Sequence, residues 1–247
     1  MFKRAAKISF WILIISGWII LSGFVTNYYD ELTLENIEIN FINDNSQKFI
    51  TKSEVNSMLL LMGIVNNVSL KKEIQLASIE KKLLNHSAIR NAQVYFNNNG
   101  GLKVDITKRT PIARFVSSVF EKNFYMDLRG FLMPISKTYV SRVPIFSGEI
   151  NFPERLDLNI LDSLHRTPIF QEIYKMSKLI NNDTFLKSQI VQIHINNNGY
   201  FELIPRIGNQ KILFGSIENM EKKFKKINLF YKNGPQPKDL NKYDTLN

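Results

Sequence analysis

The side chains with catalytic potential are few and far apart in this sequence. Its 247 residues include three histidines, His86, His165 and His194, which are separated by 79 and 29 positions. None forms the i, i+3 or i, i+4 pair that binds zinc from one helix, and there is no H-E-x-x-H motif. The sequence has no cysteine, which excludes disulfides, thiolate metal sites and cysteine nucleophiles. We therefore expect no metal and no cofactor.

Other catalytic signatures are also missing from the sequence. It has no G-x-S-x-G elbow, no phosphate-binding G-x-x-x-x-G-K-[ST] loop and no G-x-G-x-x-G. Glycoside cleavage needs two convergent carboxylates, and spacing pairs none of the acids Asp127, Glu149, Glu154, Asp157 and Asp162. His86 is predicted to end a helix, where an imidazolium would meet the negative end of the helix dipole. The sequence therefore predicts a binding protein, neither an enzyme nor a protein with a small-molecule substrate.

An apolar segment near the N-terminus predicts a membrane anchor. Residues 8–29 carry no charged side chain; as a helix they would rise roughly 33 Å, against about 30 Å of hydrocarbon. Basic residues precede the segment, and Asp30 and Glu31 follow it. The positive-inside rule therefore places residues 1–7 in the cytoplasm and exports the remainder. The segment is longer than the apolar region of a cleaved signal peptide and lacks a small-x-small site, which favours a retained transmembrane helix.

The charge of the chain gives a weaker signal about partners. The formal net charge is +10, from 32 Lys+Arg against 22 Asp+Glu. Without Lys3, Arg4 and Lys7, the exported part keeps 29 basic and 22 acidic residues, a charge of +7. Its one dense cluster, the four lysines within residues 222–226, fits the solvated face of a helix better than a nucleic-acid patch. We expect no nucleic-acid partner.

The segment over residues 33–109 has the pattern of one small α+β domain. The expected elements are a strand, two helices and two strands, over residues 34–41, 52–62, 76–84, 89–96 and 102–108. Thr51 and Glu54 have the spacing of a capping box that starts the first helix. An Asn-Gly turn joins the last two strands. The β-α-α-β-β order predicts a three-stranded sheet with both helices on one face.

Short strands dominate the pattern over residues 110–247. They are predicted over residues 113–116, 124–127, 131–134, 143–146, 190–195, 200–204 and 211–214. Helical spacing of apolar residues predicts a helical region over 161–180, interrupted or restarted at Pro168, and a helix over 217–231. The fold class predicted for the whole chain is α+β: a single N-terminal transmembrane helix, the small domain, and a β-rich domain with helices.

Four segments, in register with the predicted anchor, resemble the bacterial cell-division family FtsQ, called DivIB in other bacteria. They are residues 87–94, 108–115, 125–131 and 142–148, with sequences SAIRNAQV, KRTPIARF, YMDLRGF and RVPIFSG. Two residues depart from the family pattern: Lys108 stands where Glu is usual, and Phe115 where Trp is common. The resemblance implies a POTRA domain over 33–109 and an FtsQ-type β domain over 110–247.

The same resemblance implies a non-enzymatic divisome scaffold in the inner membrane, at the division septum, with both domains in the periplasm. Members link early and late division proteins and help to control septal peptidoglycan synthesis. They use the POTRA domain for recruitment and add a strand from FtsB, which is paired with FtsL, to the distal edge of the β domain. The partner-binding residues thus implied are Asn91, Val94 and Phe96 in the POTRA domain, and Tyr243, Thr245 and Leu246 at the distal edge. For Val94 a core role, and for Phe96 a role in covering the end of the sheet, remain alternatives.

Members usually continue into a longer terminal strand. Residues 243–247 are therefore expected to be either the start of that strand or a shortened edge. Two other classes of protein stay open. An anchored POTRA protein of polypeptide transport or outer-membrane assembly would normally have several tandem POTRA units, where one is predicted here. An exported hydrolase would need convergent polar residues in a pocket.

Overall fold

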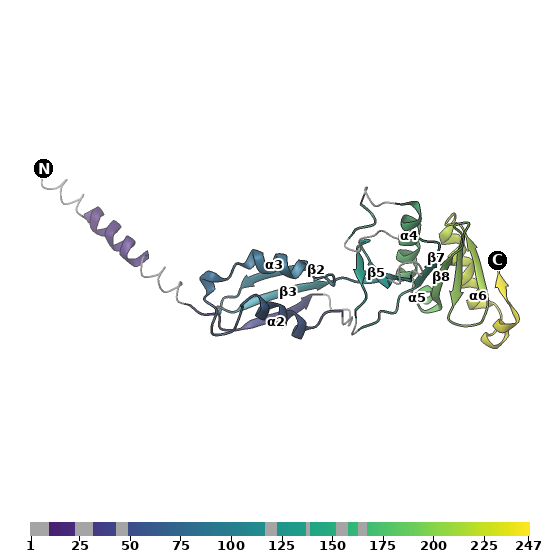
Figure 1. The fold of residues 1–247 in the computed structure, drawn as a ribbon, viewed down its shortest axis with the longest axis horizontal. Helices are drawn as coiled ribbons and strands as arrows, with labels where there is room; N and C mark the ends of the chain where they lie inside the picture. Colours follow the sequence, from purple (N-terminus) through teal and green to yellow (C-terminus); the bar gives the residue numbers. More distant parts are fainter. Residues whose placement is uncertain are drawn as a thin grey trace. The chain divides into compact units, whose positions relative to one another are not determined.

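The computed structural model describes residues 10–22, 32–42, 49–116, 123–136, 139–151, 158–162 and 167–247. Residues 10–22 form a helix. Within the described part of the chain, no helix combines the length and apolarity that crossing a membrane requires. The rest of the expected transmembrane segment, residues 8–9 and 23–29, lies outside the described residues. The chain forms two compact units (Figure 1): residues 50–108 belong to the first, and residues 109–247 belong to the second together with Phe49.

The first unit is a three-stranded sheet with two helices. Its elements are β1 (Ile37–Ile42), α2 (Lys52–Leu61), the 3-10 helix η1 (Lys71–Glu73), α3 (Leu76–Leu84), β2 (Ile89–Phe96) and β3 (Leu102–Lys108). The strand order is β1-β3-β2. β3 lies in the centre, parallel to β1 and antiparallel to β2. The β-α-α-β-β order is the predicted one, and it makes β2 an edge strand.

Local sequence signals explain how these elements form. The capping box is present, because the Thr51 hydroxyl accepts from the Glu54 amide and the Glu54 carboxylate accepts from the Thr51 amide. α2 contacts β1 and α3 contacts β2. The buried helix residues are Val55, Leu59, Ile79 and Leu83, which complete a core with the buried strand residues Ile39, Ala92, Val94, Leu102, Val104 and Ile106. The sheet is therefore held by apolar burial from its helices.

The second unit is one large mixed sheet with helices. Its strands are β4 (Pro111–Val116), β5 (Asn123–Asp127), β6 (Leu132–Pro134), β7 (Ile145–Gly148), β8 (Ile190–Ile195), β9 (Phe201–Pro205), β10 (Lys211–Gly215) and β11 (Thr245–Leu246). Its helices are α4 (Pro168–Asn182), α5 (Thr184–Gln189), α6 (Met220–Asn233) and the 3-10 helix η2 (Pro237–Lys242). The eight strands run in the order β11-β10-β9-β8-β7-β4-β5-β6. The two-residue strand β11 forms one edge.

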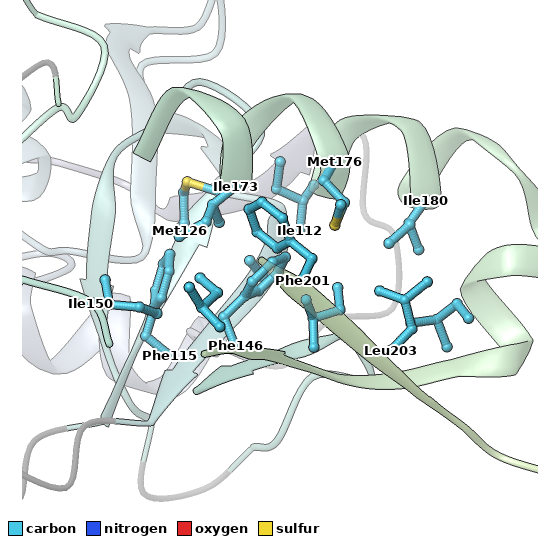
Figure 2. Close-up of a cluster of buried hydrophobic side chains, with 14 of the residues drawn as sticks. Ile112, Phe115, Met126, Phe146, Ile150, Ile173, Met176, Ile180, Phe201 and Leu203 are labelled. Atoms are coloured by element: carbon cyan, nitrogen blue, oxygen red, sulfur yellow. The ribbon is translucent and has the colours of Figure 1, made fainter. Parts of the chain in front are cut away.

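The core of the second unit lies between the sheet and its helices. Figure 2 shows Ile173, Met176 and Ile180 of α4 directed toward side chains of the strands. Phe115 and Phe146 meet there with ring centroids 5.9 Å apart. α6 adds Phe224, whose ring centroid lies 4.8 Å from that of Phe214 on β10. The helices therefore pack against strands β8 to β10 as well as against the central strands of the sheet.

Several predicted boundaries differ from the structure. α4 begins at Pro168, capped by the Thr167 hydroxyl, and Leu161 lies in a turn before it. Proline suits this first helical position, because its missing N–H would have no intrahelical acceptor there. α6 begins at Met220 and not at 217, because Asn219 has a left-handed backbone with φ 52°. α5, η1 and η2 were not predicted.

Candidate partner-binding edges

The three residues predicted in the POTRA domain all lie on the edge strand β2, but their side chains do not share one surface. Asn91 is exposed and Phe96 is partly buried. Val94 is 5% exposed and belongs to the core. Its side chain packs in the core, which was one of the two roles open for it in the sequence. Only its backbone is therefore placed where a partner could reach it.

That backbone group is occupied by a helix residue. The amide N–H of Val94 donates to Oε1 of Glu80, on α3, at 2.8 Å. Glu80 has the spacing of an ordinary polar position on an amphipathic helix, which predicts a side chain that faces water. No signal in the sequence identifies this contact, because it joins a side chain to the backbone of another element.

The three residues predicted at the distal edge lie at the end of the large sheet. Thr245 and Leu246 form β11, which pairs in parallel with Lys211 and Ile212 of β10. Tyr243 is 41% exposed, and its ring meets Phe230 of α6 edge-on. In the described chain, β11 pairs with no residue of β10 beyond Ile212. The second half of β10 therefore pairs with β9 on its inner side and has no described strand on its outer side.

A groove lies along this open part of β10. It has a volume of about 610 Å³ and is lined by β10, α6 and the end of β11. Its apolar lining includes Ile212, Phe214, Ile227, Phe230 and Leu246. Two lysines, Lys223 and Lys226, line it as well, and no acidic residue does so in the described structure. We call this site the β10 groove; it suits an apolar segment that carries a negative charge.

Lys223 departs from the predicted solvated lysine face. Lys222, Lys225 and Lys226 are exposed, whereas Lys223 is partly buried. Its ammonium donates to the carbonyl oxygens of Phe214 at 3.0 Å and of Ser216 at 2.8 Å. It also lies 5.0 Å from the centroid of the Phe214 ring. Lys223 thereby ties α6 to the end of β10.

A second groove, between α4 and α6, has about 700 Å³ of space. Its floor includes Leu179, Met220 and Phe224. Its rim mixes lysines with acids: Lys175, Lys178, Lys225, Asp183 and Glu221. This mixture gives the groove no clear preference for a charged partner.

One serine and one histidine of the second unit lie close together. Ser147 Oγ is 3.4 Å from Nδ1 of His194, and Gln192 donates to the same oxygen at 2.9 Å. Neither groove includes these residues. Their strand register places them side by side on β7 and β8, where a polar cross-strand contact is ordinary. Among the described residues, no three His, Asp or Glu side chains come close enough to hold a metal ion.

His86 lies in the first unit and is neutral. His86 is not the predicted imidazolium: burial lowers its pKa, against a smaller opposite effect of Glu54, and its Nδ1 accepts from the Ala88 amide at 3.3 Å. A neutral ring is required for that acceptor role. His165, Glu154 and Asp157 lie outside the described residues.

Two family models match this chain. The model described as FtsQ/DivIB, C-terminal related, matches residues 110–247, which are more than half of the chain and make up nearly all of the second unit. The chain belongs to the FtsQ/DivIB family. The model of a POTRA-like domain matches residues 34–107, which contain the β-α-α-β-β unit. No curated protein matches the chain.

Membership confirms the family that the four segments predicted, and the α+β class agrees with it. Proteins of the FtsQ/DivIB family act in cell division and interact with other proteins of the divisome. β2 and β11, which carry all the predicted partner-binding residues except Tyr243, both lie at sheet edges. An edge strand presents backbone groups that can pair with another chain.

Proposed function

We propose that this FtsQ/DivIB-family chain is a non-enzymatic, single-pass membrane scaffold of the divisome. It binds FtsB together with FtsL, links early and late division proteins, and helps to control septal peptidoglycan synthesis. The observation that carries the proposal is the open part of β10 beside the β10 groove.

Strand addition fits this edge for two reasons. Backbone groups of an exposed strand provide affinity to an incoming strand, and pockets for alternate side chains provide specificity. The β10 groove offers such a pocket directly beside the edge. In the proposal, Thr245 and Leu246 begin the pairing surface, and Tyr243 supports it through its contact with Phe230.

The POTRA domain supplies the second contact. Asn91 is exposed on β2, and Phe96 lies at the end of that strand. We assign these side chains to recruitment by upstream division proteins, together with the backbone of Val94 where such a partner displaces the Glu80 carboxylate from the Val94 amide. The site is separate from the FtsB site in sequence and in structural unit, which is what a scaffold with two kinds of partner needs.

Anchoring in the inner membrane completes the proposal. The large apolar side chains of the helix over residues 10–22 are exposed; Leu13, for example, is 71% exposed and Trp18 73%. A helix that is apolar on all sides needs an apolar solvent or a partner. In the proposal it is part of the transmembrane segment over residues 8–29, with residues 1–7 in the cytoplasm and both domains in the periplasm at the septum.

Binding of purified full chain to the FtsB–FtsL complex tests the proposed function. The parent chain should bind, and Leu246→Lys should weaken binding at least ten-fold, because it adds a positive charge beside Lys223 and Lys226. Tyr200→Lys is the matched control. Tyr200 is 51% exposed at the tip of the β8–β9 hairpin and does not line the groove.

Two results would contradict the proposal. One is a folded full chain that does not bind FtsB–FtsL. The other is a Leu246→Lys chain that binds as tightly as the Tyr200→Lys control.

A further inference from the structure

β2, one of the two edge strands of the first unit, differs from the edge of the second unit in how its backbone is covered. β2 has eight residues and lies at the edge of its sheet. A long edge strand is a template on which a second copy of the same chain can add its own strand. Proteins commonly block such edges with charged side chains or with a covering element. The residue that covers β2 therefore indicates how this chain protects that edge from strand addition.

The direction of the Val94 amide shows which backbone groups of β2 point outward, where an added strand would pair with them. β2 is antiparallel to β3, and Val94 lies opposite Val104. The Val94 N–H donates to Glu80 and hence points away from β3. Inward and outward groups alternate along a strand, so Ala92 and Phe96 share this outward direction. The contact with Glu80 thus takes the middle donor of the row that an added strand would use.

Glu80 is held in position by its helix. Its neighbour Ile79 and the nearby Leu83 are 3% and 0% exposed, so α3 is fixed against the sheet. Figure 1 shows α3 and β2 next to each other, in agreement with their contacts. Glu80 itself is partly buried. A carboxylate that accepts from a backbone N–H forms a charge-assisted bond, which is stronger than a neutral one.

We propose that Glu80 is an edge guard, which closes β2 to strand addition by a second copy of this chain. A partner that pairs with the β2 backbone must first displace the Glu80 carboxylate from the Val94 amide. The inference does not depend on FtsB binding, because it concerns the other unit and a different strand. It also holds whether or not upstream division proteins use β2.

Hydrogen exchange resolved to single amides tests the contact itself. The full chain is studied in detergent micelles at low concentration, so that self-association does not protect the edge. In Glu80→Ala the Val94 amide should exchange at least ten-fold faster than in the parent. Glu80→Gln keeps a side-chain oxygen as acceptor and should show an intermediate rate. Equal exchange of Val94 in the parent and in Glu80→Ala would overturn the inference.

Sedimentation equilibrium of the same chains tests the consequence. Glu80→Ala should lower the concentration at which half of the chain is dimeric by at least ten-fold. Glu73→Ala is the matched control, because Glu73 is exposed on η1 and should leave that concentration unchanged. A Glu80→Ala chain that is folded and as monomeric as the parent would refute the proposal that Glu80 prevents strand addition to β2. If Glu80→Ala does not fold, Glu80→Gln decides: because it weakens the contact by removing the charge, it should dimerise at a lower concentration than the parent, and a Glu80→Gln chain as monomeric as the parent would refute the proposal.

Discussion

At the scale of single residues, a buried carboxylate with three polar contacts lies at the start of the second unit. Asp127 is 1% exposed and receives Arg109 at 2.9 Å, together with the backbone amides of Arg129 and Phe131 at 2.8 and 2.9 Å. The guanidinium of Arg109 also lies 4.3 Å from the centroid of the Phe131 ring. One carboxylate therefore organises the turn between β5 and β6 and neutralises a largely buried cation.

Removing that carboxylate should be costly. We expect Asp127→Ala to lower the free energy of unfolding by about 3–5 kcal/mol, because Arg109 would remain buried without its counter-ion. Urea denaturation of the full chain measures the change. The control is Asp239→Ala, which removes an ion pair with Lys242, whose side chain is 75% exposed; its cost should stay below about 1 kcal/mol. Equal costs would show that the Asp127 network is not stabilising.

His86 should make stability depend on pH. Burial lowers the pKa of the folded His86 imidazole from 6.5, so the unfolded chain binds its proton more readily. Its contribution is then fully present above the unfolded pKa and is lost as the pH falls from that value toward the folded pKa. Urea midpoints measured from pH 8 to pH 5 should fall for the parent. They should fall less for His86→Asn, which retains an acceptor for the Ala88 amide; an unchanged slope would contradict the assignment.

Whether a contact between residues was predictable depends on how far apart its partners lie in sequence. Thr51 and Glu54 are three residues apart, so their capping box was predictable from a local motif, and it is present. Glu80 binds the backbone of β2 at Val94, and Lys223 binds the backbone of β10 at Phe214. Such contacts require the packing of a helix on a sheet, which no local pattern specifies.

At the scale of elements, Gly148 at the end of β7 allows this strand to pack closely against β8. Its φ is +102°, and a Cβ there would lie 2.0 Å from the carbonyl oxygen of Ile195 on β8. Because that neighbour is backbone of the paired strand, it has little freedom to move. Gly199, at the β8–β9 turn, has φ +77° but no atom within 4 Å of a Cβ. A side chain at Gly199 would therefore meet backbone strain alone, whereas a side chain at Gly148 would meet both backbone strain and a steric clash with β8.

Alanine substitution at both glycines tests this reading. Gly148→Ala should destabilise the chain by about 3–5 kcal/mol, from backbone strain combined with overpacking. Gly199→Ala should cost only about 1–2 kcal/mol, from strain alone. Urea denaturation of the two variants measures the difference. Equal costs would mean that β7 and β8 separate easily at this point.

The elements themselves were largely predictable, because amphipathic periods and turn residues are local. α3, β2, β3 and β8 have the predicted bounds. Strand order was not predictable in the same way. β7 lies between β4 and β8, and it is parallel to both, although about forty residues separate it from β8 along the chain. Pairing over such distances is decided by the assembled core and not by any one segment.

At the scale of the whole molecule, the two predicted sets of partner-binding residues fall on two edge strands in two units. The resemblance placed them there through matching segments, and local chemistry would not have done so, because Val94 and Leu246 are ordinary apolar residues. What could not be predicted is how each edge is covered. Glu80 binds the backbone of β2 near the middle of that strand, whereas the second half of β10 has no strand among the described residues on its outer side and lies beside an apolar groove, with Lys223 bound to the Phe214 carbonyl oxygen. This difference favours β10 as the edge for strand addition.

The proposed membrane topology makes one further prediction, which the composition renders simple to test. The chain has no cysteine, so one introduced cysteine is the only thiol. We expect a membrane-impermeant maleimide to label Asn197→Cys in intact spheroplasts, because Asn197 is exposed on the exported side of the proposed anchor. Phe2→Cys, in the proposed cytoplasmic residues 1–7, should be labelled only after the membrane is permeabilised. Labelling of both cysteines before permeabilisation, or of neither, would refute a single span over residues 8–29.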